Sequence, residues 1–178
     1  MAGSFTAEQV GNGDAGGKRD GLPNGQVYEN IMATMKGRAM TAAGTEAGGM
    51  TGGCRCGAIT YTATGAPAHH AVCHCTECRR SSGSFAVGWA LFPRDSVAIE
   101  GQPVAYESSP GTIRQFCGTC GTGLFYVNEA IFPGQIDIQS ATLDDPDALP
   151  AQARIQTADA PHWMAGFADL PAFERFPG

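Results

Sequence analysis

Seven cysteines in three tight groups are the feature that most constrains how this chain of 178 residues can fold. The groups, in chain order, are Cys54-x-Cys56, Cys73-x-Cys75-x-x-Cys78 and Cys117-x-x-Cys120. An odd number of cysteines cannot be used up by a complete set of disulfides. Cysteines clustered in this way more often bind a metal ion or carry out thiol chemistry when the compartment is reducing.

The N-terminal sequence and the overall charge indicate the compartment and the class of partner. The start, MAGSFTAEQVGNGD, lacks the basic and apolar stretches of a secretory signal, so we expect a cytoplasmic protein. No apolar run approaches the roughly 20 residues of a membrane-spanning helix, so no membrane partner is expected. The net charge is −6 and only 11 residues are Lys or Arg, which argues against a nucleic-acid partner. A small molecule is the expected partner.

The first and third cysteine groups predict a closed metal site. Cys54 and Cys56 lie on the same side of an extended segment and can reach one ion. Cys117 and Cys120 lie in the stretch FCGTCGTG, a turn of the zinc-knuckle type in which a glycine follows each cysteine. Two such pairs supply four thiolates, which is the complete tetrahedral set of a structural Zn²⁺.

The middle group then forms a second site of its own. Cys73, Cys75 and Cys78 supply three thiolates and leave one position open, which is typical of a catalytic zinc. Three alternatives stay open at this point: a histidine that completes the site, a single zinc with spare thiols, or a redox dithiol in one of the C-x-x-C pairs. The histidines of the chain are His69, His70, His74 and His162.

Short β-rich runs separated by Gly, Pro and Asp turns follow Met50 and predict a mainly β domain with minimal helix. We expect antiparallel sheets in a sandwich or barrel-like arrangement. The expected strands lie within residues 58–64, 85–92, 96–100, 104–108, 112–117, 123–127, 135–143 and 153–157. The helical candidates are residues 76–82 and 145–150.

Composition divides the chain into two parts. Residues 1–49 hold eleven of the 25 glycines, no cysteine and little apolar periodicity. Such a segment cannot bury enough apolar surface to offset its ordering entropy, so we expect a disordered or weakly structured extension. Residues 50–178 are the expected zinc-binding domain.

Several side chains near the middle cysteine group are weaker candidates for function. Arg79 and Arg80 can balance the thiolates or bind a substrate carboxylate, but they can equally be solvated surface charges. Glu77 can carry a proton or stand exposed. Three aromatic residues of the next expected strand are predicted to fill the core: Phe85, Trp89 and Phe92.

The motifs GGCRCGAITY, CHCTECRRSSGS, FCGTCGTGLFY and ATLDDPD resemble the glutathione-dependent formaldehyde-activating enzymes, also called the centromere-protein-V/GFA family. The resemblance covers roughly residues 51 to 170 and includes His162-Trp163. It implies a β-tent fold of antiparallel sheets around two zinc sites. It implies a structural zinc at Cys54, Cys56, Cys117 and Cys120. It implies a catalytic zinc at Cys73, Cys75 and Cys78.

The resemblance also implies an activity, the condensation of glutathione with formaldehyde to S-(hydroxymethyl)glutathione, which is classed as a carbon–sulfur lyase reaction. The partners would be a small-molecule thiol and an aldehyde. A zinc ion with three thiolates would favour the thiolate form of such a substrate. A related thiol–electrophile reaction and a non-catalytic zinc-stapled β module for partner binding are the alternatives. The sequence does not define an oligomeric state.

Overall fold

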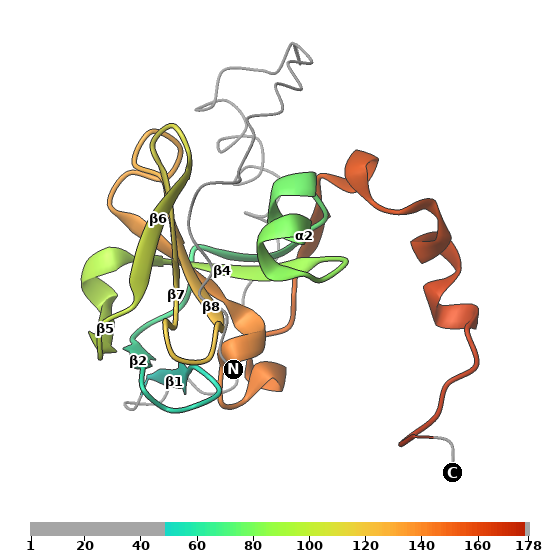
Figure 1. Cartoon of the computed structure of the whole chain (residues 1–178), viewed down its shortest axis with the longest axis horizontal. Coiled ribbons are helices and arrows are strands. Elements are labelled where there is room, and N and C mark those ends of the chain that lie inside the picture. The colour runs from blue at the N-terminus through green and yellow to red at the C-terminus, as the bar shows by residue number, and fades with distance from the viewer. Residues whose placement is uncertain (1–48, 177–178) are drawn as a thin grey trace, which may run out of the picture.

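The computed structural model describes residues 49–176, so the extension expected over residues 1–49 lies almost wholly outside the described residues. The strands are β1 (Met50–Gly53), β2 (Thr60–Ala63), β3 (His69–Cys73), β4 (Val87–Pro93), β5 (Val97–Glu100), β6 (Val104–Ser109), β7 (Thr112–Phe116), β8 (Gly123–Val127), β9 (Gln135–Gln139) and β10 (Ala153–Ile155). The helical elements are α2 (Thr76–Ser82) and the 3₁₀ turns η1 (Arg94–Ser96), η2 (Ser140–Thr142), η3 (Pro146–Ala148), η4 (Thr157–Asp159) and η5 (His162–Asp169). The fold is mainly β, as predicted (Figure 1).

Two sheets carry the fold. The smaller has the strand order β1-β2-β5, and the larger has the order β10-β3-β4-β9-β8-β7-β6. The strand pairs are antiparallel except that β10 runs parallel to β3. The prediction of antiparallel sheets is therefore confirmed, with one parallel edge pair. This pair arises because the connection after β9 carries the chain back past β4 and β3, so that β10 forms the edge of the sheet beside β3.

Each of the eight expected strand segments contains a strand, and helix α2 covers the expected residues 76–82. The expected strand over residues 135–143 is shorter, because Ser140–Thr142 turn into a 3₁₀ helix. The expected helix over residues 145–150 is a single 3₁₀ turn, Pro146–Ala148. Two strands were not expected, β1 and β3. Strand β1 contains two glycines, which disfavour strands on their own, and it forms through its pairing with β2.

Neighbouring residues of β4 point to opposite faces of the larger sheet and enter different clusters. Ala90 and Phe92 pack into the main core with Tyr61 of the smaller sheet. Trp89 packs on the other face, with Cys73 and with Cys78 of α2. The three-cysteine group therefore lies on the face of the larger sheet that is turned away from the main core.

The core prediction is confirmed for two of the three aromatic residues and is wrong for the third. Phe92 is fully buried and Trp89 is 6% exposed, whereas Phe85 is 55% exposed. Phe85 precedes the first residue of β4, so the sheet does not bury it. Its ring instead meets the ring of Trp163 edge-on, with 4.8 Å between the centroids.

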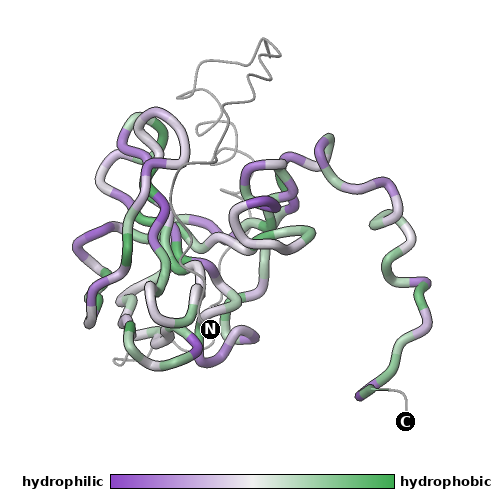
Figure 2. Tube along the Cα trace, viewed as in Figure 1, coloured by the Kyte–Doolittle hydropathy of each residue, from purple (hydrophilic) through white to green (hydrophobic). Residues whose placement is uncertain are grey.

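The C-terminal segment leaves the body beside α2 and runs away from it (Figure 1). Asp159 ties its start to the helix by accepting a hydrogen bond from the backbone N–H of Thr76 at 3.1 Å. Several stretches of this segment are hydrophobic, as the hydropathy colouring shows (Figure 2). The large exposed side chains there are Trp163, Phe167, Leu170, Phe173 and Phe176.

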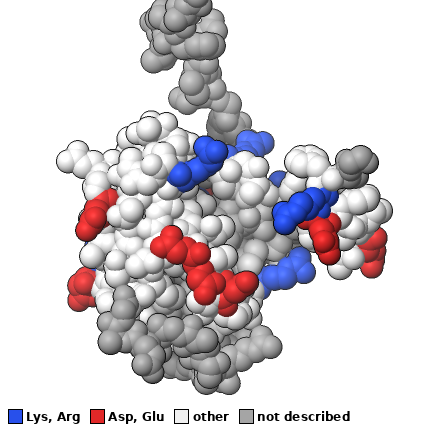
Figure 3. Space-filling view, turned by 90° about the horizontal axis from the view of Figure 1, so that it is seen from below, with Lys and Arg blue, Asp and Glu red and all other residues white. Residues whose placement is uncertain are grey.

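The surface and the helices bear on the expected partner classes. On the face drawn in Figure 3, acidic side chains form several patches, and the basic side chains are scattered rather than joined into one broad surface. Within residues 49–176, every helical element is too short or too polar to cross a bilayer.

Candidate metal centres

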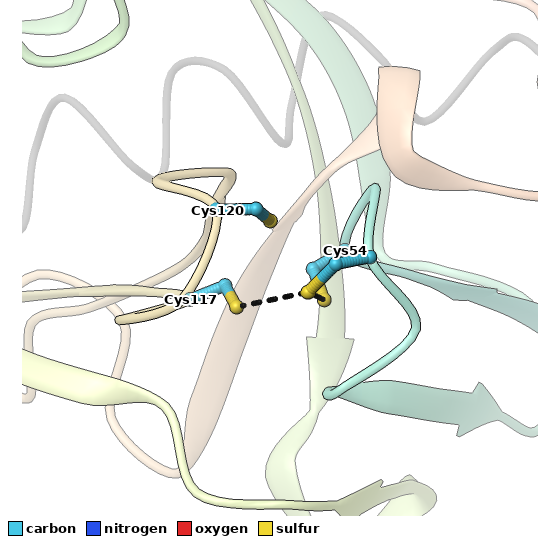
Figure 4. Close-up of side chains that lie close together, drawn as sticks. Cys54, Cys117 and Cys120 are labelled. Atoms are coloured by element: carbon cyan, nitrogen blue, oxygen red, sulfur yellow. Dashed lines mark hydrogen bonds between the residues drawn. The ribbon is translucent and has the colours of Figure 1, made fainter.

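Four thiols from two distant loops meet at one point. The sulfur atoms of Cys54, Cys56, Cys117 and Cys120 all lie within 4.8 Å of one another. The Sγ atoms of Cys54 and Cys56 are 3.5 Å apart, and those of Cys56 and Cys117 are 3.7 Å apart. Figure 4 shows the two loops facing each other, with the sulfurs of Cys54, Cys117 and Cys120 turned toward the space between them. Tetrahedral zinc with Zn–S bonds of about 2.3 Å places its sulfurs about 3.8 Å apart, so the thiols fit that ion.

The two loops hold these sulfurs by local hydrogen bonds. The backbone N–H of Ile59 donates to the Sγ of Cys54 at 3.3 Å. In the second loop, Gly121 adopts a left-handed backbone with φ +77° and donates its N–H to the carbonyl of Cys117 at 2.8 Å. The hydroxyl and the backbone N–H of Thr122 lower the pKa of Cys120 to about 5. This loop is therefore ready to hold its thiol in the thiolate form that a metal ion binds.

The other cysteines come together at the start of helix α2. Cys73 ends β3, Cys75 is the N-cap of α2, and Cys78 lies in its first turn. The three sulfurs lie within 4.8 Å of one another. The Sγ of Cys75 accepts a hydrogen bond from the backbone N–H of Cys78 at 3.3 Å, so the same atom caps the helix and faces the cluster. Gly83 ends the helix in the left-handed region with φ +68°.

No fourth ligand joins this cluster among the residues that the structure describes. None of the described histidines has a ring nitrogen within 4.8 Å of all three sulfur atoms. The Nε2 of His74 lies 3.3 Å from the Nε of Arg154, and the Nε2 of His70 lies 2.8 Å from the Oγ of Ser140. Burial lowers the pKa of His69 to about 4. The cluster therefore offers three protein ligands, where the first centre offers four.

One buried cation, Arg114 of β7, touches the three-cysteine cluster. Its Nη2 donates to the Sγ of Cys78 at 3.6 Å, and its Nε donates to the Oγ of Ser108 at 3.2 Å. The guanidinium carbon lies 5.9 Å from the ring centroid of Trp89 and 5.2 Å from that of Tyr126, at cation–π distance. Hydrogen bonds from Cys73, Cys75 and Arg114 lower the pKa of Cys78.

Sequence reasoning named Arg79 and Arg80 as candidates for this charge-balancing role, with solvated surface charges as the alternative, and the structure places Arg114 there instead. Arg79 donates its Nε to the backbone carbonyl of His74, and its Nη2 lies at the limit of hydrogen bonding to the hydroxyl of Thr76. Arg80 and Glu77 are exposed. Arg114 was missed because it lies 36 residues beyond Cys78 in the sequence and no local motif marks it.

A buried carboxyl group lies in the same row of residues across strands β7, β8 and β9 as Arg114. Asp137 of β9 stands opposite Tyr126 of β8 in register, and Tyr126 stands opposite Arg114 of β7. Burial raises the pKa of Asp137 to about 8, and the negative charge of Cys78 adds to the effect while Arg114 opposes it. Its Oδ1 is buried and has no hydrogen-bond partner. Burial of the carboxyl therefore favours its neutral form, which limits the negative charge beside the thiolates.

The division into four and three thiols predicts the metal content. The purified protein is expected to hold two zinc ions per chain, and Cys73→Ser is expected to hold one. Elemental analysis by mass spectrometry together with a protein concentration measurement checks both values. One ion per chain in the wild type, unchanged in Cys73→Ser, would rule out two separate centres.

Comparisons with known proteins gave a family and a similar solved structure. A protein-family model described as "Glutathione-dependent formaldehyde-activating enzyme" matches residues 49–159, which include all seven cysteines. The crystal structure of a Rhodobacter sphaeroides protein is similar with 22% sequence identity and a TM-score of 0.48, covering 59% of this chain and 99% of that one. A search of curated proteins gives no significant match.

Proposed function

The chain belongs to the family of glutathione-dependent formaldehyde-activating enzymes, and from this premise we propose that it is a carbon–sulfur lyase that condenses glutathione with formaldehyde. A related reaction between another small thiol and another electrophile would use the same site. We further propose that residues 50–178 form the zinc-binding domain and that the protein acts in the cytoplasm.

The observation that carries this proposal is the difference between the two cysteine groups. Cys54, Cys56, Cys117 and Cys120 surround one point with four thiols, whereas three thiols meet at the start of α2. We propose that the first group holds a structural Zn²⁺ and that Cys73, Cys75 and Cys78 hold a catalytic one. Because three protein ligands leave one tetrahedral position open, a substrate thiol can take the fourth.

The residues around the open centre suit a reaction that needs a thiolate. A zinc ion held there would favour the ionised form of a bound thiol at neutral pH. The sulfur of the substrate then forms a bond to the aldehyde carbon, and the proton that the thiol lost ends on the former carbonyl oxygen. Arg114 offsets one negative charge of the thiolates, and burial favours the neutral form of Asp137. Both effects lower the cost of adding a further thiolate to a buried, sulfur-rich site.

The test of the proposed function compares two ligands that differ only at sulfur. Glutathione is expected to bind the zinc-loaded protein at least about tenfold more tightly than S-methylglutathione, because the methylated sulfur cannot ionise and is a weak metal ligand. Isothermal titration calorimetry measures both affinities. Exchange NMR with added formaldehyde then measures whether the protein speeds formation of the S-hydroxymethyl adduct over the spontaneous background.

The two halves of this experiment separate different failures. Equal affinity for both ligands would show that the sulfur does not reach the metal. Tight binding of glutathione without acceleration of adduct formation would point to a different electrophile. Binding of neither ligand would exclude glutathione as the thiol.

A further inference from the structure

A pocket of about 280 Å³ lies beside the three-cysteine cluster. Its lining includes Arg114 and Trp89, which also contact the sulfur of Cys78, and Ser81, which comes from helix α2. A larger pocket of about 490 Å³ lies against the smaller sheet and borders Cys54, away from the open cluster. The smaller pocket is therefore connected to the open cluster through Arg114 and Trp89.

The charge of Arg114 is the unusual feature of this pocket. The side chain is only 7% exposed, and its hydrogen bonds go to the hydroxyl of Ser108 and the sulfur of Cys78. A buried cation without an anionic partner is unfavourable. The thiolate of Cys78 supplies an anion on one side of the guanidinium. The residues that line the pocket include Arg114 and no Asp or Glu.

The hydrogen-bonding capacity of Arg114 is only partly used. A guanidinium has five N–H donors, and the hydrogen bonds of Arg114 engage its Nε and its Nη2. The side chain lines the pocket together with Gln115 and Gln139, whose amide groups can also donate. The rings of Trp89 and Tyr106 supply apolar wall. This combination of a guanidinium, amide donors and aromatic walls is suited to a carboxylate carried on a short aliphatic chain.

We propose that this pocket binds a carboxylate of the thiol substrate, with Arg114 as the anion-binding residue. The inference rests on the proposed function, because the thiol must reach the open centre for its other end to reach the pocket. The pocket is too small for a whole tripeptide and suits one carboxylate-bearing end of it. The substrate class is therefore a small thiol with a carboxylate within reach of its sulfur, and Arg114 selects it over neutral thiols of equal reactivity.

The experiment compares glutathione with glutathione diethyl ester, in which the thiol is intact and both carboxylates are masked. The protein is loaded with Co²⁺, because the sulfur-to-cobalt charge-transfer bands report directly whether a thiolate has joined the metal. We expect both thiols to change these bands, and glutathione to do so at an about tenfold lower concentration, as a charge-assisted hydrogen bond predicts. If glutathione and its diethyl ester reach half-saturation of the wild-type protein at the same concentration, the proposal is overturned, and no variant is needed for this result.

Substitutions then test whether Arg114 causes the preference. Arg114→Gln is expected to weaken the binding of both thiols, because a positive charge beside Cys78 is lost. Glutathione is expected to lose about tenfold more affinity than the diester, so that the preference disappears, and Arg114→Lys is expected to restore part of it. Arg94→Gln is the matched control, because Arg94 pairs with Glu129 on the surface at 2.8 Å. A preference that persists in Arg114→Gln would overturn the role of Arg114. If neither thiol changes the charge-transfer bands, the proposed function fails together with the carboxylate site. If both thiols change the bands at equal concentrations, only the carboxylate site is rejected.

Discussion

Cys117→Ser is expected to lower the melting temperature by more than about 10 °C and to reduce the soluble yield. Cys117 is 1% exposed, and its sulfur meets that of Cys56, which lies 61 residues earlier in the chain. A structural zinc contributes apparent binding free energies of about 10–16 kcal/mol in small zinc domains, and this energy stabilises the fold. The net stability of a domain is only about 5–15 kcal/mol, so the loss of one of four ligands removes a large share of it.

Thermal unfolding followed by circular dichroism, with zinc analysis of the soluble fraction, measures this effect. Thr119→Ser is a suitable control, because Thr119 is exposed in the same loop and contributes no ligand. A melting temperature within about 2 °C of the wild type would mean that the four-thiol centre does not support the fold.

Cys75→Ser is expected to lower the rate of adduct formation at least about a thousandfold. The melting temperature is expected to stay within about 5 °C of the wild type. The reason lies in the double role of this residue, whose sulfur caps helix α2 by accepting the N–H of Cys78. Serine is a good N-cap residue, so its hydroxyl can keep the helix in place. A neutral hydroxyl is a poor zinc ligand, so the open centre loses one of its three thiolates.

The measurement pairs the rate of adduct formation with thermal unfolding of the same preparation. Ser84→Ala, which removes an exposed hydroxyl shortly after the helix, controls for changes in local packing. If Cys75→Ser and Cys117→Ser unfold to the same extent, the two centres do not divide into a structural and a catalytic one. Full activity in Cys75→Ser would remove this cysteine from the catalytic centre.

The parts of the site that could be predicted from sequence are those set by short spacing. Cys54 and Cys56 share one loop, and Cys75 and Cys78 share one turn of helix, so their proximity follows from local geometry. The grouping of the two outer pairs into one centre followed from the ligand number of zinc, and the structure brings their sulfurs together as expected. The strand segments were also predictable, because turn residues separate runs of β-branched and aromatic residues.

The parts that could not be predicted depend on strand register over long distances. Arg114 reaches Cys78 because β7 pairs with β8 and β8 with β9 in one particular register, which brings Arg114, Tyr126 and Asp137 into one row. Neither Arg114 nor Asp137 has a local motif that marks it. The exposure of Phe85 could not be predicted for a similar reason, because it depends on the residue at which β4 begins.

Strand β7 contacts the three-cysteine cluster and ends directly before a cysteine of the four-thiol centre. Arg114 lies in the middle of this strand and contacts Cys78, and Cys117 follows directly after its last residue, Phe116. The pairing of β7 with β8 shifts register between Gln115 and Phe116, so the position of the loop and the alignment of the strand depend on each other. A chain that has lost the four-thiol ion would therefore also lose the defined placement of its buried guanidinium. For the proposed reaction, loss of the structural ion is therefore expected to lower activity as well as stability.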